Sequence, residues 1–197
     1  MPSPTPPRTE TILFVHGIWD TGRVWGRFAR RAEEAGFRTL CPSFTASSGK
    51  EPLAGFVDQV RAMILQERPK HLIGFSLGGV VSRAALGDPE VADSLATFLT
   101  ISAPHRGSWG AFFFRQGRGY RQLRPGSDFL KALPEPPDSL SVESYWTALD
   151  LMILPSYYTY WKGQRNRHFW KVLHPWMLTD RRVQAAALRH LAKGGRS

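Results

Sequence analysis

The stretch KHLIGFSLGG, residues 70–79, decides the fold of this chain. Its apolar first half predicts a buried strand over Lys70–Phe75, and the small and apolar residues that follow predict a helix over Leu77–Leu86. Between them lies GFSLG, a G-x-S-x-G pattern at the strand-to-helix turn. In such a turn the serine adopts a strained conformation that exposes its hydroxyl, and glycine neighbours let the backbone cross itself closely. Ser76 is therefore our candidate nucleophile.

Outward from this stretch, strand-like and helix-like segments alternate along most of the chain. Such alternation predicts an α/β fold, a mostly parallel sheet with helices on both faces. The predicted strands are Thr11–His16, Phe37–Phe44, Lys70–Phe75, Ala96–Ala103, Val142–Leu149 and His168–Leu173. The predicted helices are Arg23–Gly36, Leu53–Arg68, Leu77–Leu86 and Thr179–Ala192, the last with Thr179 as its cap.

The length of 197 residues suits one domain with a substantial core. We expect a single domain over residues 1–197, with flexible tails at 1–10 and 193–197. Between residues 104 and 139 the alternation breaks, and several Gly and Pro residues predict a loop-like or cap-like region.

Composition narrows the class of protein. No apolar stretch approaches the roughly 18 residues that span a bilayer, and the proline-rich, polar residues 1–10 do not resemble a secretory signal, so we expect a cytoplasmic protein. Cys41 is the only cysteine, which excludes an internal disulfide and a cysteine metal cluster, and we expect a buried thiol near a strand end. The net charge is +10, but the basic residues are scattered without a zinc-finger, RNP or Walker pattern, so we expect no nucleic-acid partner.

A second motif, HGIW at residues 16–19, follows the first predicted strand. Acyl transfer places negative charge on a carbonyl oxygen, which requires fixed hydrogen-bond donors at that atom. We expect the backbone amide of Leu77 to be one donor and that of Ile18 the other, with Trp19 as the second choice after Ile18. Gly17 permits close approach of the backbone, and His16 is expected to support this loop by hydrogen bonding.

Together with HGIW and GFSLGG, the segment SAPHRGS at residues 102–108 resembles the small bacterial lipases and esterases of the α/β-hydrolase superfamily. The resemblance covers roughly residues 11–191 and is weakest between 112 and 139. It implies a minimal α/β-hydrolase fold and a serine hydrolase that cleaves carboxylic acyl esters through a Ser-His-Asp triad. It also implies the chain order Ser, Asp, His. Such a mechanism requires no metal and no organic cofactor.

By this resemblance the acid follows a late strand. Asp150, in YWTALDLMILPS at residues 145–156, occupies that position, although Leu151 stands where the family often has glycine. Asp128 begins a predicted helix and is better interpreted as a cap or first-turn acid. Asp138, in a proline-rich loop, and Asp180, after the candidate base, are two further candidates for the acid.

The base follows the last strand in this family. His174, in VLHPWMLTD at residues 172–180, fits that position. His105 is its strongest rival because it belongs to a motif, but the resemblance assigns it to loop support. His71, His168 and His190 are interpreted as structural or surface histidines.

The substrate is less apparent. Phe112–Phe114 and the cluster Tyr157, Tyr158, Tyr160 and Trp161 are expected to border the active-site edge, and arginines recur at 115, 118, 121 and 124. One interpretation is a basic, aromatic mouth for a small acyl ester or lipid, with peripheral contact to an anionic membrane surface. A second interpretation is a buried aromatic core beside a solvated arginine face. We expect a monomer.

Three functions remain open at this point. The first is a carboxylesterase or lipase. The second uses the same triad as an acyltransferase, thioesterase or amidase, which the sequence does not separate from the first. The third is a catalytically silent binding module, which the intact set of Ser76, Asp150 and His174 disfavours.

Overall fold

The computed structural model describes residues 10–170 and 173–194. Its centre is a six-stranded sheet in the order β2-β1-β3-β4-β5-β6, in which all neighbouring strands are parallel. All residues of β1, β3 and β4 are buried, as expected for a parallel sheet covered on both faces. The strands are β1 (Thr11–Val15), β2 (Arg38–Leu40), β3 (His71–Phe75), β4 (Thr97–Ile101), β5 (Ser141–Trp146) and β6 (Arg165–His168).

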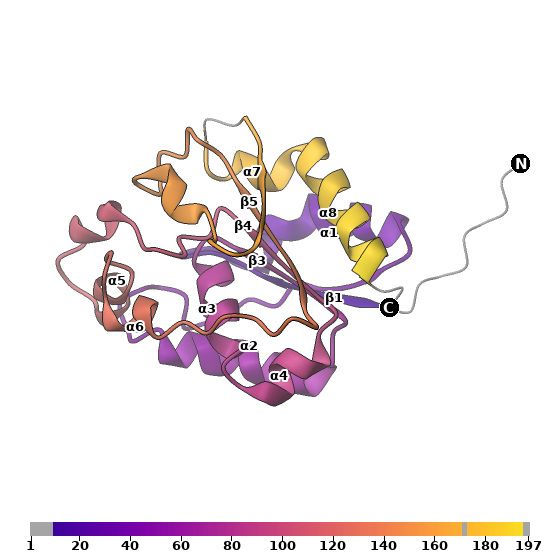
Figure 1. Ribbon diagram of the computed structural model, residues 1–197, viewed down its shortest axis with the longest axis horizontal. Helices are drawn as coiled ribbons and strands as arrows, with labels where there is room; N and C mark the ends of the chain where they lie inside the picture. The colour runs from indigo at the N-terminus through magenta and orange to yellow at the C-terminus, as the bar shows by residue number, and fades with distance from the viewer. Residues whose placement is uncertain (1–9, 171–172, 195–197) are drawn as a thin grey trace, which may run out of the picture.

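Helices cover the two faces of this sheet (Figure 1). One face carries α2 (Ala54–Glu67), α3 (Leu77–Ala85) and α4 (Pro89–Ser94), and the opposite face carries α1 (Gly26–Glu34) and α8 (Arg181–Gly194). Alternate residues of β1 enter the two cores: Leu13 and Val15 pack on the side of α2 and α3, and Ile12 and Phe14 on the side of α1 and α8. The predicted α/β fold class is confirmed.

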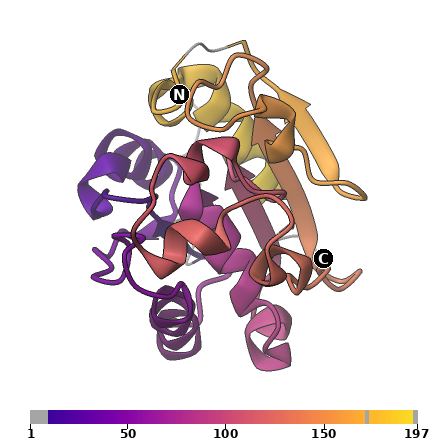
Figure 2. The ribbon, with the colours of Figure 1, turned by 90° about the vertical axis from the view of Figure 1, so that its left-hand side faces the viewer.

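Because the strands are parallel, their carboxyl ends share one edge of the sheet, and short helices gather there. Residues 104–139, predicted to be cap-like, contain η2 (Trp109–Phe112), α5 (Arg118–Gln122) and α6 (Asp128–Lys131). Figure 2 shows this region in front of the sheet when the molecule is viewed toward that edge. Three more short helices are η1 (Gly22–Trp25), η3 (Ser156–Thr159) and α7 (Trp176–Thr179).

The last strand differs from its prediction. The apolar run His168–Leu173 was the expected strand, but β6 is the polar segment Arg165–His168, and residues 171–172 lie outside the described chain. As the last strand in the sheet, β6 pairs only with β5, so its residues need not be apolar. Its first residue, Arg165, instead lies 3.4 Å from the buried carboxylate of Glu143 on β5.

Three more boundaries also differ. The strand predicted over Phe37–Phe44 reaches only Leu40, since Pro42 lacks an N–H and cannot continue the ladder. Asp180, not Thr179, caps α8, accepting hydrogen bonds from the amides of Arg182 (2.7 Å) and Val183 (3.3 Å). The strand predicted to reach Leu149 ends at Trp146.

At the chain ends, the predicted tails fall mostly outside the described residues, namely at 1–9 and 195–197. Within the described part, α8 continues to Gly194, and the Glu10 carbonyl accepts a hydrogen bond from the Arg38 amide. None of the described helices combines the length and the apolar character needed to cross a membrane.

Candidate active site

Ser76 lies between β3 and α3, in a backbone conformation that side chains rarely adopt. Its φ of 51° and ψ of −125° place it in a strained turn, as the G-x-S-x-G pattern predicts. Glycines make this turn possible, because a Cβ on Gly74 would lie 2.5 Å from Gly79 Cα, and a Cβ on Gly78 would lie 2.3 Å from Val15 O. The turn sets Ser76 at the carboxyl edge of the sheet.

Two backbone amides predicted as donors lie beside this serine. Leu77 is the first residue of α3, and the N–H groups of a first helical turn have no acceptor within the helix. Ile18 lies in the turn after β1 and lines the same cavity as Ser76 and Leu77. Among the described residues, no group accepts a hydrogen bond from either amide. Both are therefore available to a ligand oxygen.

The backbone amide of Trp19, the second choice for the donor in this loop, already donates a hydrogen bond to Ser47 O at 3.3 Å. It is therefore not free to bind a ligand oxygen. The His16 ring contacts this loop: its Nε2 accepts from the Phe44 amide at 2.9 Å, and its Nδ1 lies 2.9 Å from Gly17 O. The first contact makes Nε2 an acceptor, so Nδ1 carries the proton. His16 does not line either cavity at Ser76.

Asp150 and His174 form a buried pair, although 24 residues separate them. His174 Nδ1 lies 2.6 Å from Asp150 Oδ2, and both side chains are almost fully buried. The second carboxylate oxygen, Oδ1, accepts from the amides of Met152 and Ile153, each at 2.9 Å. The loop after β5 thus fixes the carboxylate, and the carboxylate fixes the imidazole.

Ser76 and His174 line one cavity. Two cavities of about 380 Å³ each adjoin Ser76. Ile18 lines both; the first also contains Leu77 and a mostly apolar wall, and the second also contains His174. The buried His174 Nε2 has no hydrogen-bond partner in the described part of the chain, and no hydrogen bond joins it to Ser76 Oγ. The structure therefore places Ser76, Asp150 and His174 close together, but Ser76 and His174 are not hydrogen-bonded.

The rival acids and bases lie elsewhere. Asp128 occupies the first turn of α6, Asp138 is exposed, and Asp180 caps α8. Buried His105 lies 3.1 Å from Thr100 Oγ1 and packs on Trp161, away from both cavities. Three more histidines lie within hydrogen-bond or ion-pair distance of structural partners: His71 with Thr97, His168 with the Ala148 amide and His190 with Glu143.

Asp20 was not predicted as a residue of this site. Its carboxylate lines the cavity that contains His174, and no hydrogen bond joins the two side chains within the described chain. Burial raises the pKa of Asp20, and the nearby histidines 16 and 174 oppose that rise. The only signal in the sequence was its place directly after HGIW, at the carboxyl end of the first predicted strand.

The aromatic segments divide between surface and core. Phe113 and Phe114 line the apolar cavity as expected, but Trp161 is buried against Phe98 and His105. The apolar loop Leu151–Leu154, which was not predicted to lie there, supplies part of the wall. Cys41 follows β2 and is half-buried, and burial raises the pKa of its thiol to about 11, which makes it a poor nucleophile.

No group of three or more His, Cys, Asp or Glu side chains suited to a metal ion occurs within residues 10–170 and 173–194.

Acid should destabilise the fold through His105. Burial and the nearby Arg83 guanidinium hold its pKa well below that of an unfolded histidine, about 6.5. The unfolded chain therefore binds the extra proton first, and stability is lost as pH falls below about 6.5. We expect this residue to remove about 1 kcal/mol from the unfolding free energy between pH 7 and 5.5.

Urea unfolding of wild type and His105→Gln at both pH values tests this. The variant should lose about 1 kcal/mol less than wild type over this range. Ser102→Ala, which alters a buried polar side chain without removing a titratable group, serves as the control and should keep the wild-type pH dependence. Equal pH dependence in wild type and His105→Gln would contradict the assignment.

Comparisons with known proteins agree with this architecture. A family model described as "Alpha/beta hydrolase family" matches residues 12–197. The search of curated proteins found no match. Solved structures that resemble the chain include Bacillus licheniformis lipase BlEst2 in its mature form, with a TM-score of 0.74 and 16% identity over 95% of this chain and 94% of that one.

Two further structures are similar. Aspergillus fumigatus lipase B has a TM-score of 0.74 at 13% identity. The match covers 96% of this chain and 55% of the lipase chain, so this chain spans about half the length of that protein. A structure from Nitrososphaera gargenis, in work on carboxylesterases, has a TM-score of 0.67 at 11% identity, covering 96% of this chain and 92% of that one. At such identities these likenesses show the fold alone. The family match, the parallel sheet and the serine turn together establish that this chain belongs to the alpha/beta hydrolase family.

Proposed function

We propose that the protein is a serine hydrolase that cleaves carboxylic acyl esters through a covalent acyl-enzyme. The observation that carries the proposal is the buried Asp150–His174 pair, whose unpartnered Nε2 belongs to a residue lining the same cavity as Ser76. A serine hydroxyl is a weak nucleophile until a base accepts its proton. The pair supplies an oriented base for that purpose.

In the first half-reaction, Ser76 Oγ bonds to the ester carbonyl carbon while its proton passes to His174 Nε2. Asp150 holds the imidazole through Nδ1 and stabilises the imidazolium that forms. The amides of Ile18 and Leu77 donate to the oxyanion. The carbon–oxygen bond to the alcohol then breaks, and the alcohol takes the proton from Nε2.

In the second half-reaction, water takes the place of the alcohol. His174 accepts its proton, the hydroxide oxygen bonds to the acyl carbon, and Ser76 leaves with the proton returned. The lack of a hydrogen bond between Ser76 and His174 is compatible with this sequence of steps, because such contacts often tighten only when substrate binds.

The two cavities suggest how an ester lies in the site. The acyl oxygen must reach the Ile18 and Leu77 amides, so the acyl chain belongs in the apolar cavity that contains them. The alcohol must receive its proton from His174, so the leaving group belongs in the second cavity, where Asp20 also lies. This assignment favours esters with an extended acyl chain.

Active-serine labelling and an ester series test the proposal. A fluorophosphonate should label the wild-type chain, with the adduct on the peptide that contains Ser76. Along a series of esters of one alcohol, each methylene buried in the apolar cavity should raise kcat/KM about fourfold. An unlabelled protein would contradict the proposal, and greatest activity on acetyl esters would contradict the placement of the acyl chain in the apolar cavity.

A parallel series of thioesters, amides and alcohol acceptors separates the different uses of the same residues. Faster turnover of a thioester or an amide, or acyl transfer to an added alcohol in preference to water, would replace the esterase assignment. A labelled protein with no turnover of any substrate would indicate a binding module.

A further inference from the structure

Exposed apolar side chains are concentrated at one edge of this molecule. All the exposed large hydrophobic residues of the described chain lie in segments that follow the carboxyl ends of β1, β4, β5 and β6. Monomeric soluble proteins rarely gather such residues on one surface without a binding role. They are Trp19, Trp109, Phe112, Phe113, Phe114, Leu149, Leu151, Met152, Leu154, Tyr157, Tyr160, Trp170, Leu173 and Trp176.

Part of this set forms one continuous surface around the apolar cavity, which we call the apolar rim. All of its side chains line the cavity and are exposed to solvent, and the exposed fraction of Phe113 is 83%. Two contacts join the segments that carry the rim residues. The Trp109 amide donates to Leu154 O at 2.7 Å, and the ring centroids of Trp19 and Phe114 lie 5.3 Å apart. The rim consists of Trp19, Phe113, Phe114, Leu151, Met152 and Leu154.

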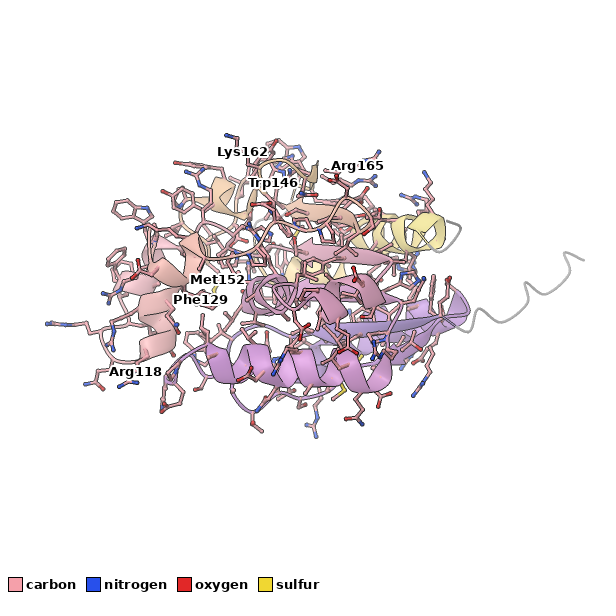
Figure 3. The ribbon with its side chains drawn as sticks, turned by 60° about the horizontal axis from the view of Figure 1, so that its bottom comes forward. Arg118, Phe129, Trp146, Met152, Lys162 and Arg165 are labelled. Carbon is pink, nitrogen blue, oxygen red and sulfur yellow. The ribbon has the colours of Figure 1, made fainter. Side chains whose placement is uncertain are left out.

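Arginines without acidic partners adjoin the rim. Residues 104–127 hold five arginines (106, 115, 118, 121 and 124) and no acid, and no ion pair involves any of them within the described chain. Several arginines elsewhere do have carboxylate partners, such as Arg38 with Glu67 at 3.5 Å. Figure 3 shows Arg118 at the end of the molecule that carries this region. The next acid along the chain, Asp128, borders a separate hollow with Arg118 and Arg121.

The two acids closest to the cavity in the described chain, Asp20 and Asp150, are shielded. The loop after β5 contains one acid, Asp150, which is buried against His174. Asp20 is half-buried within the cavity. The surface at the cavity is therefore apolar, and beside it the five arginines outnumber the two exposed acids near Arg118, Glu51 and Asp128.

We propose that the apolar rim and its arginines dock on the surface of an anionic phospholipid bilayer. Aromatic side chains insert at the boundary between headgroups and acyl chains, and arginines bind the lipid phosphates. A second copy of this chain fits less well, because a two-fold contact would bring the same unpaired arginines of both copies together. Docking would face the mouth of the cavity toward the lipid. The proposal goes beyond ester hydrolysis and does not require it.

Co-sedimentation with vesicles tests the docking. Wild type should bind vesicles of phosphatidylcholine that contain phosphatidylglycerol, should bind pure phosphatidylcholine far less, and should dissociate as NaCl is raised to about 0.5 M. Ser76→Ala should bind as wild type does. This separates a failure of docking from a failure of the proposed hydrolysis.

Variants locate the surface. Arg115→Gln combined with Arg118→Gln should weaken binding to anionic vesicles about 25-fold, since each basic residue near such a surface contributes about fivefold. Turnover of a short soluble ester should stay unchanged in this variant. The matched control is Lys70→Gln with Lys193→Gln, which removes two exposed charges, one just before β3 and one near the end of α8. It should bind as wild type does.

Phe113→Ser should weaken binding at least about tenfold, whereas Phe113→Leu, which keeps an apolar side chain, should stay within about threefold of wild type. Absent binding, equal binding to both vesicle types, or an equal loss in the Lys70/Lys193 control would overturn the proposal. A stable dimer in solution that Phe113→Ser dissociates would also overturn it, since a second copy would then occupy the rim.

Discussion

Replacing Ser76 by alanine is expected to lower ester turnover by about 10⁶-fold while leaving the protein folded. The magnitude follows the loss seen when the nucleophile of a serine hydrolase is removed. The fold should survive because Ser76 Oγ makes no hydrogen bond within the described residues, and alanine is no bulkier in the strained turn. Steady-state kinetics and thermal unfolding of both proteins measure the two effects.

Ser102 provides a matched control for this substitution. It also follows a strand directly, β4, and has a positive φ of 48°, but it is buried outside both cavities. Ser102→Ala should therefore retain turnover within a few-fold of wild type. If Ser76→Ala kept turnover within tenfold, or Ser102→Ala lost as much, Ser76 would not be the nucleophile.

Asp150→Asn is expected to lower kcat by about 10⁴-fold, as the same change does in the serine-protease triad. The hydrogen bonds of Asp150 explain why. Its Oδ1 accepts from two backbone amides, and the asparagine carbonyl oxygen would keep those contacts. The NH₂ group would then face His174 Nδ1, which would become an acceptor. The ring proton would move to Nε2, the atom that must accept the proton of Ser76.

Asp20→Asn and Asp138→Asn control for the loss of a carboxylate. Asp20 shares the cavity with His174 without a hydrogen bond to it, and Asp138 is exposed and lines neither cavity at Ser76. Asp20→Asn should cost at most about tenfold in kcat, and Asp138→Asn should be neutral. A loss at Asp20 larger than that at Asp150 would show that Asp20 is the carboxylate that orients the candidate base.

The strand before Ser76 and the helix after it were predictable because short-range patterns specify them. The apolar run over β3, the glycines and the small residues of α3 all lie within sixteen residues of one another. Boundaries were less predictable where pairing decides them: β6 is polar because it lies at the edge of the sheet, and residues 169–170 directly after it are not in a strand. Helix α4 was missed although Asp88-Pro89-Glu90 carries a cap and a proline at its start.

For the candidate site, the chain order Ser, Asp, His came from a resemblance, and it pointed to residues that the structure brings together. The sequence could not decide whether the amide of Ile18 or that of Trp19 is the free donor. That depends on Ser47, 28 residues further along the chain, whose carbonyl accepts a hydrogen bond from the Trp19 amide. Asp20 was missed for a similar reason: its importance lies in sharing a cavity with His174, 154 residues away.

The sequence by itself determined the parallel α/β layering, the strained turn at Ser76 and the excess of positive charge, since each is written in neighbouring residues or in composition. Only the tertiary structure decided that Asp150 and His174 pair, that Trp161 is core while Phe113 is surface, and that the unpaired arginines adjoin the apolar rim. The physical reason is that periodicity reports which residues are apolar, whereas burial and partnership depend on contacts between segments far apart in the chain.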